Sequence, residues 1–244
     1  MSEKYNKIVA NHYSAFRPPL HEIILKKVLS ENEKFECGLD IGCGTGYSAI
    51  ALTNYCSHVI GVEPSKSMLD KSIPNKKITY LQGFGNCLPP SIQSANIVTF
   101  AGSLFYTKSS ELTKELKRVC SDNALIVVYD FMVLFEEILG FFDIKRKKTD
   151  SDYNHEENFN DNTSFNKISS HKEQISLTVT AEDLAHVLLA NSNILDLFMD
   201  KYNITDPFFM LVKELEATKK QLDLKVNIYY SKYKINTDEN RAKK

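Results

Sequence analysis

The chain alternates short, nearly continuous apolar runs with segments whose apolar residues recur every three or four positions. The apolar runs predict strands over 35–42, 58–64, 77–83, 95–102 and 124–131. The segments with helical periodicity predict helices over 46–56, 65–73 and 109–120. Short apolar strands separated by helices are typical of a parallel sheet that is covered on both faces.

The flanking regions predict further elements and one irregular segment. Residues 4–30 are expected to be helical, with a break near Arg17–Pro19. After the predicted sheet, the pattern indicates a helix over 131–142, a strand over 174–180, helices over 181–202 and 207–222, and a strand over 224–235. The polar stretch 145–166 is rich in Asn and Asp, and we interpret the region near 145–170 as a mobile surface loop. Because the chain has no internal repeat and no Pro/Ser-rich linker, we expect one domain.

Composition narrows the class of protein. With 244 residues, 43% hydrophobic, the chain can bury a large core without disulfide or metal support. The net charge of -1 provides no general basic field, which argues against a dedicated partner among nucleic acids or anionic membranes. The five cysteines are odd in number and lack C-x-x-C spacing, which indicates a reduced chain. No signal-peptide pattern and no long apolar run is present, so we expect a cytoplasmic protein without a membrane span.

The stretch "GLDIGCGTGYSAIAL" (38–52) places a glycine loop between a predicted strand and a predicted helix. Such a loop lets backbone N–H groups approach a ligand at a helix N-terminus. A phosphate loop of the Walker type needs a lysine after its last glycine, whereas Tyr47 follows Gly46 here. The dinucleotide fingerprint G-x-G-x-x-G also fails, because Tyr47 takes the place of its third glycine.

Two acidic residues favour a different ligand. Asp40 lies two positions before Gly42, where it would repel a pyrophosphate and suit a ligand with positive charge; capping of loop amides is its alternative role. Glu63 ends the second predicted strand, 21 positions after Gly42. A carboxylate at that place can accept hydrogen bonds from both hydroxyls of a ribose.

Taken together, these motifs resemble those of the class I S-adenosylmethionine-dependent methyltransferases. "LDIGCGTGYSAIAL" is similar to their first motif, "VIGVEPSKSML" to their ribose-binding motif and "ITYLQGFGNCLP" to the segment beside the adenine. "ANIVTFAGSLFY" resembles their fourth-strand motif, and "ELKRVCSDNALIVVYDF" the helix and strand usually written E-x-x-R-V-L-K-P-G-G. The resemblance covers roughly 35–131. Within the family, "YSAFRPPLHEIILKKVL" and "LTVTAEDLAHVLLANSNI" look most like the type 11 branch that includes trans-aconitate methyltransferases.

The resemblance implies a fold and a division of the chain. The fold is α/β: a Rossmann-like, doubly wound sheet of seven strands, mostly parallel, with an antiparallel C-terminal edge strand and helices on both faces. The single domain over 1–244 would comprise N-terminal lid helices (1–34), a cofactor-binding core (35–131) and a substrate-side C-terminal part (132–240).

The resemblance also implies a cofactor, S-adenosyl-L-methionine, with S-adenosyl-L-homocysteine as product. The residues that would bind it are Asp40, Gly42, Cys43, Gly44, Gly46, Glu63, Pro64, Met68, Phe84, Gly85, Asn86, Ala101 and Gly102. Three positions depart from the family pattern. Phe84 stands where the adenine segment normally has an acidic residue, Asn96 replaces an aspartate before the fourth strand, and Asp122–Asn123 replaces a P-G-G turn.

The implied function is methyl transfer to a small-molecule acceptor by in-line displacement, which positioning and desolvation can accelerate. Residues expected to contact the substrate or form a lid are Tyr13, Arg17, Phe105 and Tyr106; for Tyr13 and Arg17, docking of the N-terminal helix is an equal alternative. No catalytic residue is assigned, and His12 is expected to be an exposed helix histidine.

We expect no metal site, since the His155–Glu156 pair lacks a second histidine at the right spacing. The expected partner is a small molecule rather than a nucleic acid or a membrane, and the protein would be a monomer or homodimer. Two alternatives stay open: a cofactor-binding protein without transfer activity, and a nicotinamide oxidoreductase.

Overall fold

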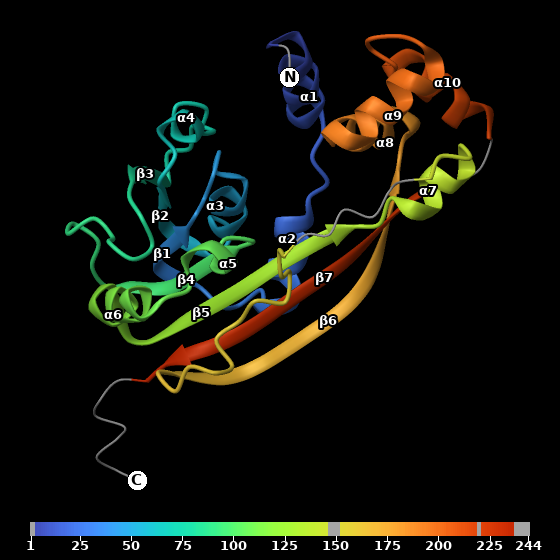
Figure 1. The fold of residues 1–244 in the computed structure, drawn as a ribbon. Coiled ribbons are helices and arrows are strands. Elements are labelled where there is room, and N and C mark those ends of the chain that lie inside the picture. The colour runs from blue at the N-terminus through green and yellow to red at the C-terminus, as the bar shows by residue number, and fades with distance from the viewer. Residues whose placement is uncertain (1–2, 146–151, 219–220, 237–244) are drawn as a thin grey trace. The chain divides into compact units, whose positions relative to one another are not determined.

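A computed structural model describes residues 3–145, 152–218 and 221–236, and its seven strands form one sheet in the order β3-β2-β1-β4-β5-β7-β6 (Figure 1). The strands are β1 (Phe35–Ile41), β2 (Cys56–Glu63), β3 (Ile78–Gln82), β4 (Ala95–Ala101), β5 (Cys120–Val133), β6 (Phe165–Val179) and β7 (Leu222–Ile235). Strands β1 to β5 pair in parallel, and β7 runs antiparallel. The predicted Rossmann-like sheet is confirmed.

The antiparallel C-terminal strand was expected at the edge of the sheet, and this position is wrong. β7 lies between β5 and β6, so β6 is the edge strand. The burial of the two strands gives the physical reason. Leu224, Val226 and Ile228 of β7 are fully buried, whereas β6 is exposed or half-buried at every position after Phe165. Polar and charged residues suit a strand whose outer edge has no partner.

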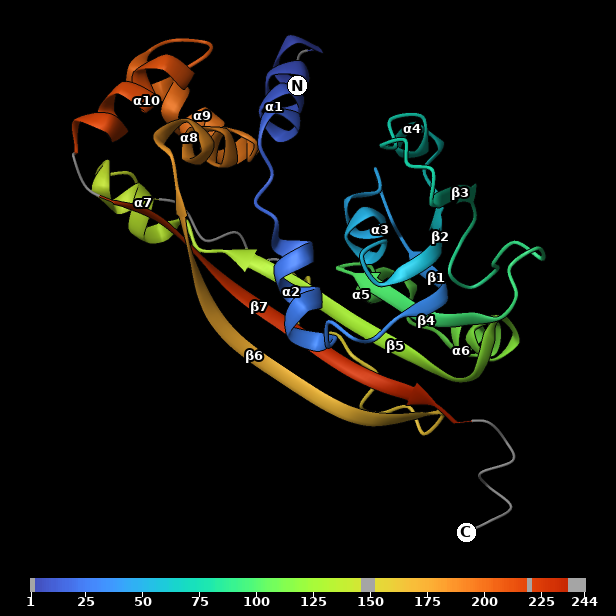
Figure 2. The same cartoon turned by 180° about the vertical axis from the view of Figure 1, so that it is seen from behind.

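The helices are α1 (Glu3–Ala15), α2 (Leu20–Val28), α3 (Tyr47–Leu52), α4 (Lys66–Leu69), α5 (Leu104–Thr107), α6 (Ser110–Val119), α7 (Glu136–Phe141), α8 (Ala181–Leu189), α9 (Ser192–Tyr202) and α10 (Phe208–Ala217). Figures 1 and 2 show α2 and α3 on one face of the sheet and α5 and α6 on the other. Helix α6 begins where Ser109 Oγ accepts a hydrogen bond from the Leu112 amide at 3.0 Å.

The chain divides into two compact units. The core unit comprises Leu20–Phe131, Asp152–Glu173 and Ile228–Lys244, and the helical unit comprises Met1–Pro19, Met132–Ser151 and Gln174–Asn227. Strands β5, β6 and β7 contribute residues to both units. That the whole chain forms one domain stays a prediction.

The interior of the core unit follows the predicted periodicity. Leu112, Leu116 and Val119, which recur at helical spacing on α6, are fully buried against strand residues such as Val98 and Ile126. Asn96, which departs from the family pattern, links three strands: its Oδ1 accepts from the Cys37 amide at 2.9 Å, and its Nδ2 donates to Ser121 Oγ at 3.1 Å. The amide can do both because it carries a donor and an acceptor.

The helical unit departs from the expectation of one helix over 181–202. Helix α8 ends at Leu189 and α9 begins at Ser192, because the Asn191 side chain accepts hydrogen bonds from the amides of Asn193 and Ile194. An asparagine that satisfies these amides starts a new helix rather than continuing the old one.

His12 was expected to be exposed, and this prediction is wrong. It is 6% exposed within the helical unit, where α1 packs on α8. Its Nδ1 lies 2.9 Å from Nδ1 of His186, and both imidazoles stack on the ring of Phe208. The position on α1 alone did not reveal that another helix covers this side chain.

Where the predicted mobile loop near 145–170 lies in the described residues, it contains a series of turns and the beginning of β6; 146–151 lie outside the described residues, and the mobility stays a prediction. Strand β6 begins at Phe165, nine residues before the predicted strand. The side-chain oxygens of Asn154, Asn158 and Asn162 each accept a hydrogen bond from the amide two residues later, at 3.0, 2.9 and 3.0 Å. The asparagine-rich composition therefore forms a series of Asx turns. Between these turns, Phe159 is buried in the core cluster and contacts Phe165.

Candidate functional site

The glycine loop between β1 and α3 is held by main-chain hydrogen bonds to β2. The carbonyl of Val62 accepts from the amides of Gly42 and Cys43 at 2.8 and 3.1 Å. This contact places the loop at the carboxyl ends of the parallel strands, next to the point where the strand order reverses between β1 and β4. Open α/β sheets bind their ligands at that point.

The three glycines of the loop have positive φ values, but their surroundings differ. A Cβ on Gly42 would lie 2.4 Å from Ser103 Cβ, and one on Gly46 would lie 2.1 Å from the Tyr80 hydroxyl oxygen. Around Gly44, among the residues that the structure describes, the one side-chain atom within 4 Å of such a Cβ would be Met68 Sδ, at 3.8 Å. Gly42 and Gly46 are therefore required by packing within the protein, whereas Gly44 borders open space that a ligand can enter.

Glu63, at the end of β2, fastens the loop to the segment that follows. Its buried carboxylate accepts hydrogen bonds from the amide of Gly44 at 3.0 Å and from the amide of Ser65 at 2.9 Å. A carboxylate offers about four lone-pair sites, so acceptor capacity remains for ligand hydroxyls. Glu63 thus lies beside the open side of Gly44 and can bind a ribose there.

Asp40 lies beneath the loop rather than at its surface. The residue is 0% exposed, and its carboxylate accepts from Ser48 Oγ at 2.5 Å and Thr99 Oγ1 at 2.8 Å. Burial raises the pKa of Asp40 to about 6. The hydrogen bonds from the two hydroxyls act in the opposite direction and lower this pKa, while the nearby Glu63 carboxylate raises it. The alternative role predicted for Asp40 was to accept hydrogen bonds from loop amides, whereas the donors in the structure are the hydroxyls of Ser48 and Thr99.

The segment after β3 forms a tight turn. The Cys87 amide donates to the Phe84 carbonyl at 3.0 Å. Phe84 itself is 60% exposed. Gly85 packs closely, since a Cβ there would lie 3.1 Å from Thr107 Cβ and 3.4 Å from Ile41 Cγ2. The structure therefore brings the Phe84–Asn86 turn to the end of β1.

The E-x-x-R pair of α6 anchors the chain just after this turn. Glu115 Oε2 accepts from the Leu88 amide at 2.8 Å, and Arg118 donates to the Leu88 carbonyl at 3.1 Å. Arg118 also pairs with Glu115, which holds the pKa of that carboxyl below its usual range. This positioning role was not recognised from the sequence, although the motif itself was noted.

Gly102 follows β4 with a φ of 70° and lies against side chains that the sequence did not single out. A Cβ on Gly102 would lie 3.1 Å from Asp130 Oδ1 and 3.4 Å from the Tyr153 hydroxyl oxygen. Phe105 and Tyr106, expected near a substrate, have their ring centroids 4.9 and 5.5 Å from that of Tyr153. The predicted residues of this loop are thus brought together with an unpredicted tyrosine.

Asp130, Tyr153 and His155 form the part of the site that sequence reasoning missed. Asp130 Oδ2 lies 2.7 Å from the Tyr153 hydroxyl and 2.9 Å from His155 Nδ1. Burial, and then the hydrogen bond to Asp130, raise the pKa of Tyr153. The one available signal was Asp130 itself, a carboxylate in the apolar run of β5; Tyr153 and His155 lie in the segment interpreted as a loop.

The remaining predicted lid residues, Tyr13 and Arg17, belong to the helical unit. The Arg17 guanidinium carbon lies 3.7 Å from the centroid of the Tyr13 ring, a cation–π contact that is compatible with docking of the N-terminal segment. Their role toward a ligand stays a prediction.

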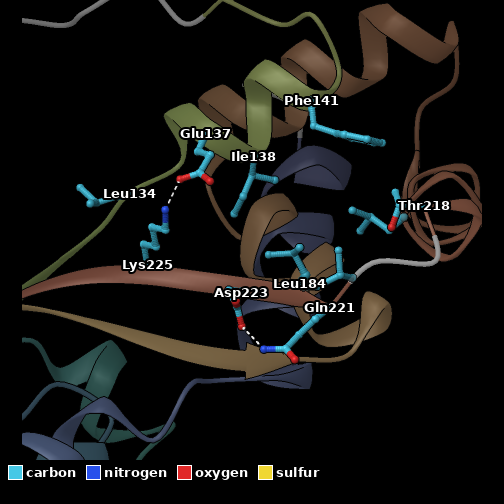
Figure 3. A pocket seen from close by; sticks show the side chains of 11 residues that line it. Leu134, Glu137, Ile138, Phe141, Leu184, Thr218, Gln221, Asp223 and Lys225 are labelled. Carbon is cyan, nitrogen blue, oxygen red and sulfur yellow. Dashed lines mark hydrogen bonds and ion pairs between the residues drawn. The ribbon is translucent and has the colours of Figure 1, made fainter.

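The helical unit contains a cavity of about 390 Å³ (Figure 3). It is lined by Leu134, Glu137, Ile138, Phe141, Leu184, Leu215, Thr218, Gln221, Leu222, Asp223 and Lys225. The ion pair of Glu137 and Lys225, at 2.5 Å, and the hydrogen bond from Gln221 to Asp223, at 3.1 Å, are both visible in Figure 3. The cavity thus combines aliphatic side chains with charged groups that are already paired.

Two features are absent from the residues that the structure describes. Residues 3–145, 152–218 and 221–236 contain no cluster of three or more His, Cys, Asp or Glu side chains placed to hold a metal ion. In the same ranges, no helix has the length and apolar character needed to cross a membrane.

Part of the chain is similar to known proteins. Residues 39–128 match the family model of the type 11 methyltransferase domain. A Dictyostelium discoideum protein that carries the name of a methyltransferase is 23% identical over 124 residues, which are 50% of this chain and 47% of that protein. The release factor glutamine methyltransferase of Buchnera aphidicola is 46% identical over 54 residues, which are 21% of this chain and 20% of that enzyme. The chain therefore matches less than half of the length of either relative.

A solved structure extends the likeness to most of the chain. A protein from Anaeromyxobacter dehalogenans, described as a type II methyltransferase, matches with a TM-score of 0.60 at 16% identity, over 91% of this chain and 97% of its own. At this identity, the match concerns the fold alone. Residues 39–128 thus match the type 11 methyltransferase domain model, and the chain has the fold of the class I S-adenosylmethionine-dependent methyltransferases.

Proposed function

We propose that the protein transfers a methyl group from S-adenosylmethionine to a small-molecule acceptor. The observation that carries this proposal is the geometry of Glu63, whose carboxylate joins the Gly44 and Ser65 amides beside the open side of Gly44. An acidic strand end next to a loop with room for a ligand suits a nucleoside, and the missing Walker lysine disfavours a nucleotide triphosphate.

The residues present fit S-adenosylmethionine at each part of the molecule. Glu63 would accept from the ribose hydroxyls, and the exposed side chains of Met68 and Phe84 would flank the adenine. Gly44 would pass close to the methionine part, and the buried charge of Asp40 would favour its positive end through the loop. The cofactor supplies an electrophilic methyl group on a sulfonium. The protein's own contribution is to orient the acceptor and exclude water.

Three features support a small molecule as the acceptor. The net charge of -1 offers no general attraction for nucleic acid. The core unit has a cavity of about 250 Å³ that includes His155, and the helical unit has the larger cavity of Figure 3. Pockets of this size suit small ligands better than macromolecules. The segments "YSAFRPPLHEIILKKVL" and "LTVTAEDLAHVLLANSNI", which resemble the trans-aconitate branch, also favour a small acceptor.

Titration calorimetry with S-adenosylmethionine, S-adenosylhomocysteine and NADH tests the proposal. The wild-type protein should bind the first two and not the third. Glu63→Ala should weaken binding by about 30- to 100-fold, because charged hydrogen bonds contribute about 1.5–3 kcal/mol each. The affinity of Glu63→Gln for S-adenosylmethionine should lie between those of the wild type and Glu63→Ala, because glutamine keeps an acceptor oxygen but loses the charge.

His58→Gln on β2 is the matched control and should bind like the wild type. Retention of NADH without binding of S-adenosylmethionine would support the oxidoreductase alternative instead. Binding without turnover on any acceptor would favour a regulatory cofactor-binding protein, the reading that the non-acidic Phe84 position keeps open.

A further inference from the structure

A cluster of Asp130, Tyr153 and His155 lies beside Gly102, just after the carboxyl end of β4. Ser103, which follows Gly102, is the residue that a Cβ on Gly42 would strike at 2.4 Å. On the other side, a Cβ on Gly102 would meet Asp130 and Tyr153 at 3.1 and 3.4 Å. The cluster therefore borders the place where this sheet would bind a ligand.

The Asp130 carboxylate holds the other two side chains. Oδ1 accepts from the Phe131 amide at 2.7 Å, and Oδ2 lies 2.7 Å from the Tyr153 hydroxyl and 2.9 Å from His155 Nδ1. As an ionised carboxylate only accepts, the hydrogen of a neutral His155 sits on Nδ1. Nε2 is then left with its lone pair, the form needed to take up a proton.

His155 retains access to solvent and to a cavity. Its side chain is 30% exposed, and among the residues that the structure describes Nε2 has no hydrogen-bond partner. The residue lines the cavity of about 250 Å³ together with Tyr229, whose ring lies parallel to the imidazole at 6.0 Å. Phe105, Tyr106 and Tyr153 add an aromatic wall next to it.

We propose that His155 is the general base for an acceptor whose attacking atom carries a proton, with Asp130 as the residue that positions it. This inference rests on the proposed methyl transfer and names the acceptor class: a hydroxyl, an ammonium or an acidic carbon, and not a carboxylate, which has no proton to lose. The Tyr153 hydroxyl lies 2.7 Å from both Asp130 Oδ2 and the Gly102 carbonyl oxygen, so Tyr153 helps to hold the carboxylate beside the imidazole.

In the proposed step, the bond between the acceptor atom and its hydrogen breaks, and the proton moves to His155 Nε2 to give an imidazolium that Asp130 stabilises. The electron pair of the acceptor atom forms the bond to the methyl carbon of the sulfonium donor. The pair of the broken carbon–sulfur bond stays on sulfur, which becomes a neutral thioether.

The charged and titratable groups around His155 come from four elements. They are Asp130 on β5, Tyr229 on β7, His171 and Lys172 on β6, and Tyr153 and Glu156 on its own segment. Lys172 is paired with Glu156, so the group that interacts directly with the imidazole is Asp130.

Nitrogen NMR of histidine-labelled protein tests the geometry without any acceptor. In the wild type at neutral pH, His155 should carry its proton on Nδ1, and in Asp130→Ala the signal should shift toward the Nε2-protonated form that free imidazole side chains prefer. The His155→Gln variant assigns the resonance. A wild-type His155 with its proton on Nε2 would overturn the inference.

Transfer of the labelled methyl group tests the chemistry. With methyl-labelled S-adenosylmethionine and an extract of small metabolites, the wild type should methylate hydroxyl, amine or carbon positions. His155→Gln should lower the initial rate by about 100-fold or more and remove the rise of the rate with pH, while donor affinity in calorimetry stays unchanged. His58→Gln, on β2, should behave like the wild type.

Three results separate the outcomes. A labelled product that is a methyl ester, or a His155→Gln rate equal to that of the wild type, refutes the role of His155 and leaves the methyltransferase proposal in place. A wild-type protein that does not bind S-adenosylmethionine refutes the proposed function, and with it the step drawn for His155.

Discussion

The core unit and the helical unit each contain a cluster of buried and half-buried polar groups, and the charges of the two clusters differ. In the core unit, the carboxylates of Asp40, Glu63 and Asp130 are held by hydroxyl, amide and imidazole donors. In the helical unit, the imidazoles of His12 and His186 lie against each other and stack on an aromatic ring. Burial opposes charge in both places. The acidic groups of the core unit are thus held by hydrogen-bond donors, whereas burial in the helical unit favours neutral imidazoles that pack on each other.

The largest expected effect tests how closely the core unit is packed around its loop. Gly46→Ala places a methyl group 2.1 Å from the Tyr80 hydroxyl in a backbone with φ of 97°, and should lower the free energy of unfolding by about 3 kcal/mol. Gly44→Ala is the matched control, because its new methyl group meets open space and should lower the free energy of unfolding by about 1 kcal/mol. Relative to this small loss of stability, Gly44→Ala should weaken the binding of S-adenosylmethionine more than Gly46→Ala does. Urea unfolding and calorimetry measure both quantities. Equal losses of stability would show that packing does not distinguish the two glycines.

The next effect concerns the acidic side of the comparison. The pKa of Asp40 is raised to about 6, so the folded state binds its proton more tightly than the unfolded chain, and stability falls as pH rises from near 4 through 6. Asp40→Asn removes the buried charge and should raise the free energy of unfolding at pH 8 by on the order of 2 kcal/mol. At pH 4.5 the gain should largely vanish, because Asp40 is then protonated in the native protein. Denaturant unfolding at the two pH values measures this, and a gain independent of pH would contradict the assignment.

The smallest effect concerns the imidazole side. Burial lowers the pKa of His12 and of His186 from the ordinary 6.5, although Asp206 opposes this for His12, and Asp183 and Glu182 oppose it for His186. The unfolded chain therefore binds more protons than the folded one below about pH 6.5, and stability falls as pH decreases from there. Hydrogen exchange should show looser amides in α1 at pH 5 than at pH 7.5, after correction for the intrinsic rates. His186→Phe keeps the stacking on Phe208 and should reduce the difference; an unchanged difference would place the pH sensitivity elsewhere.

How much of the site could be predicted follows from where its residues lie in the chain. Asp40, Gly44 and Glu63 were predictable because each stands at a fixed offset from a strand end, and strand ends of a parallel sheet meet at one edge. Asp130, Tyr153 and His155 were not, because 22 positions of chain separate Asp130 from Tyr153 and no periodicity marks the segment between them. The Asx turns of Asn154, Asn158 and Asn162 depend on local geometry that a polar composition alone does not reveal.

By itself, the sequence determined the alternation of strands and helices, the glycine loop and the acidic strand ends, since these follow from local periodicity and spacing. Only the tertiary structure decided that β7 lies inside the sheet, that Asp40 is buried under its loop and that His12 is covered. It also decided which glycine borders open space and which side chains meet at Gly102. Those outcomes depend on contacts between residues far apart in the chain, whose energies no local pattern contains.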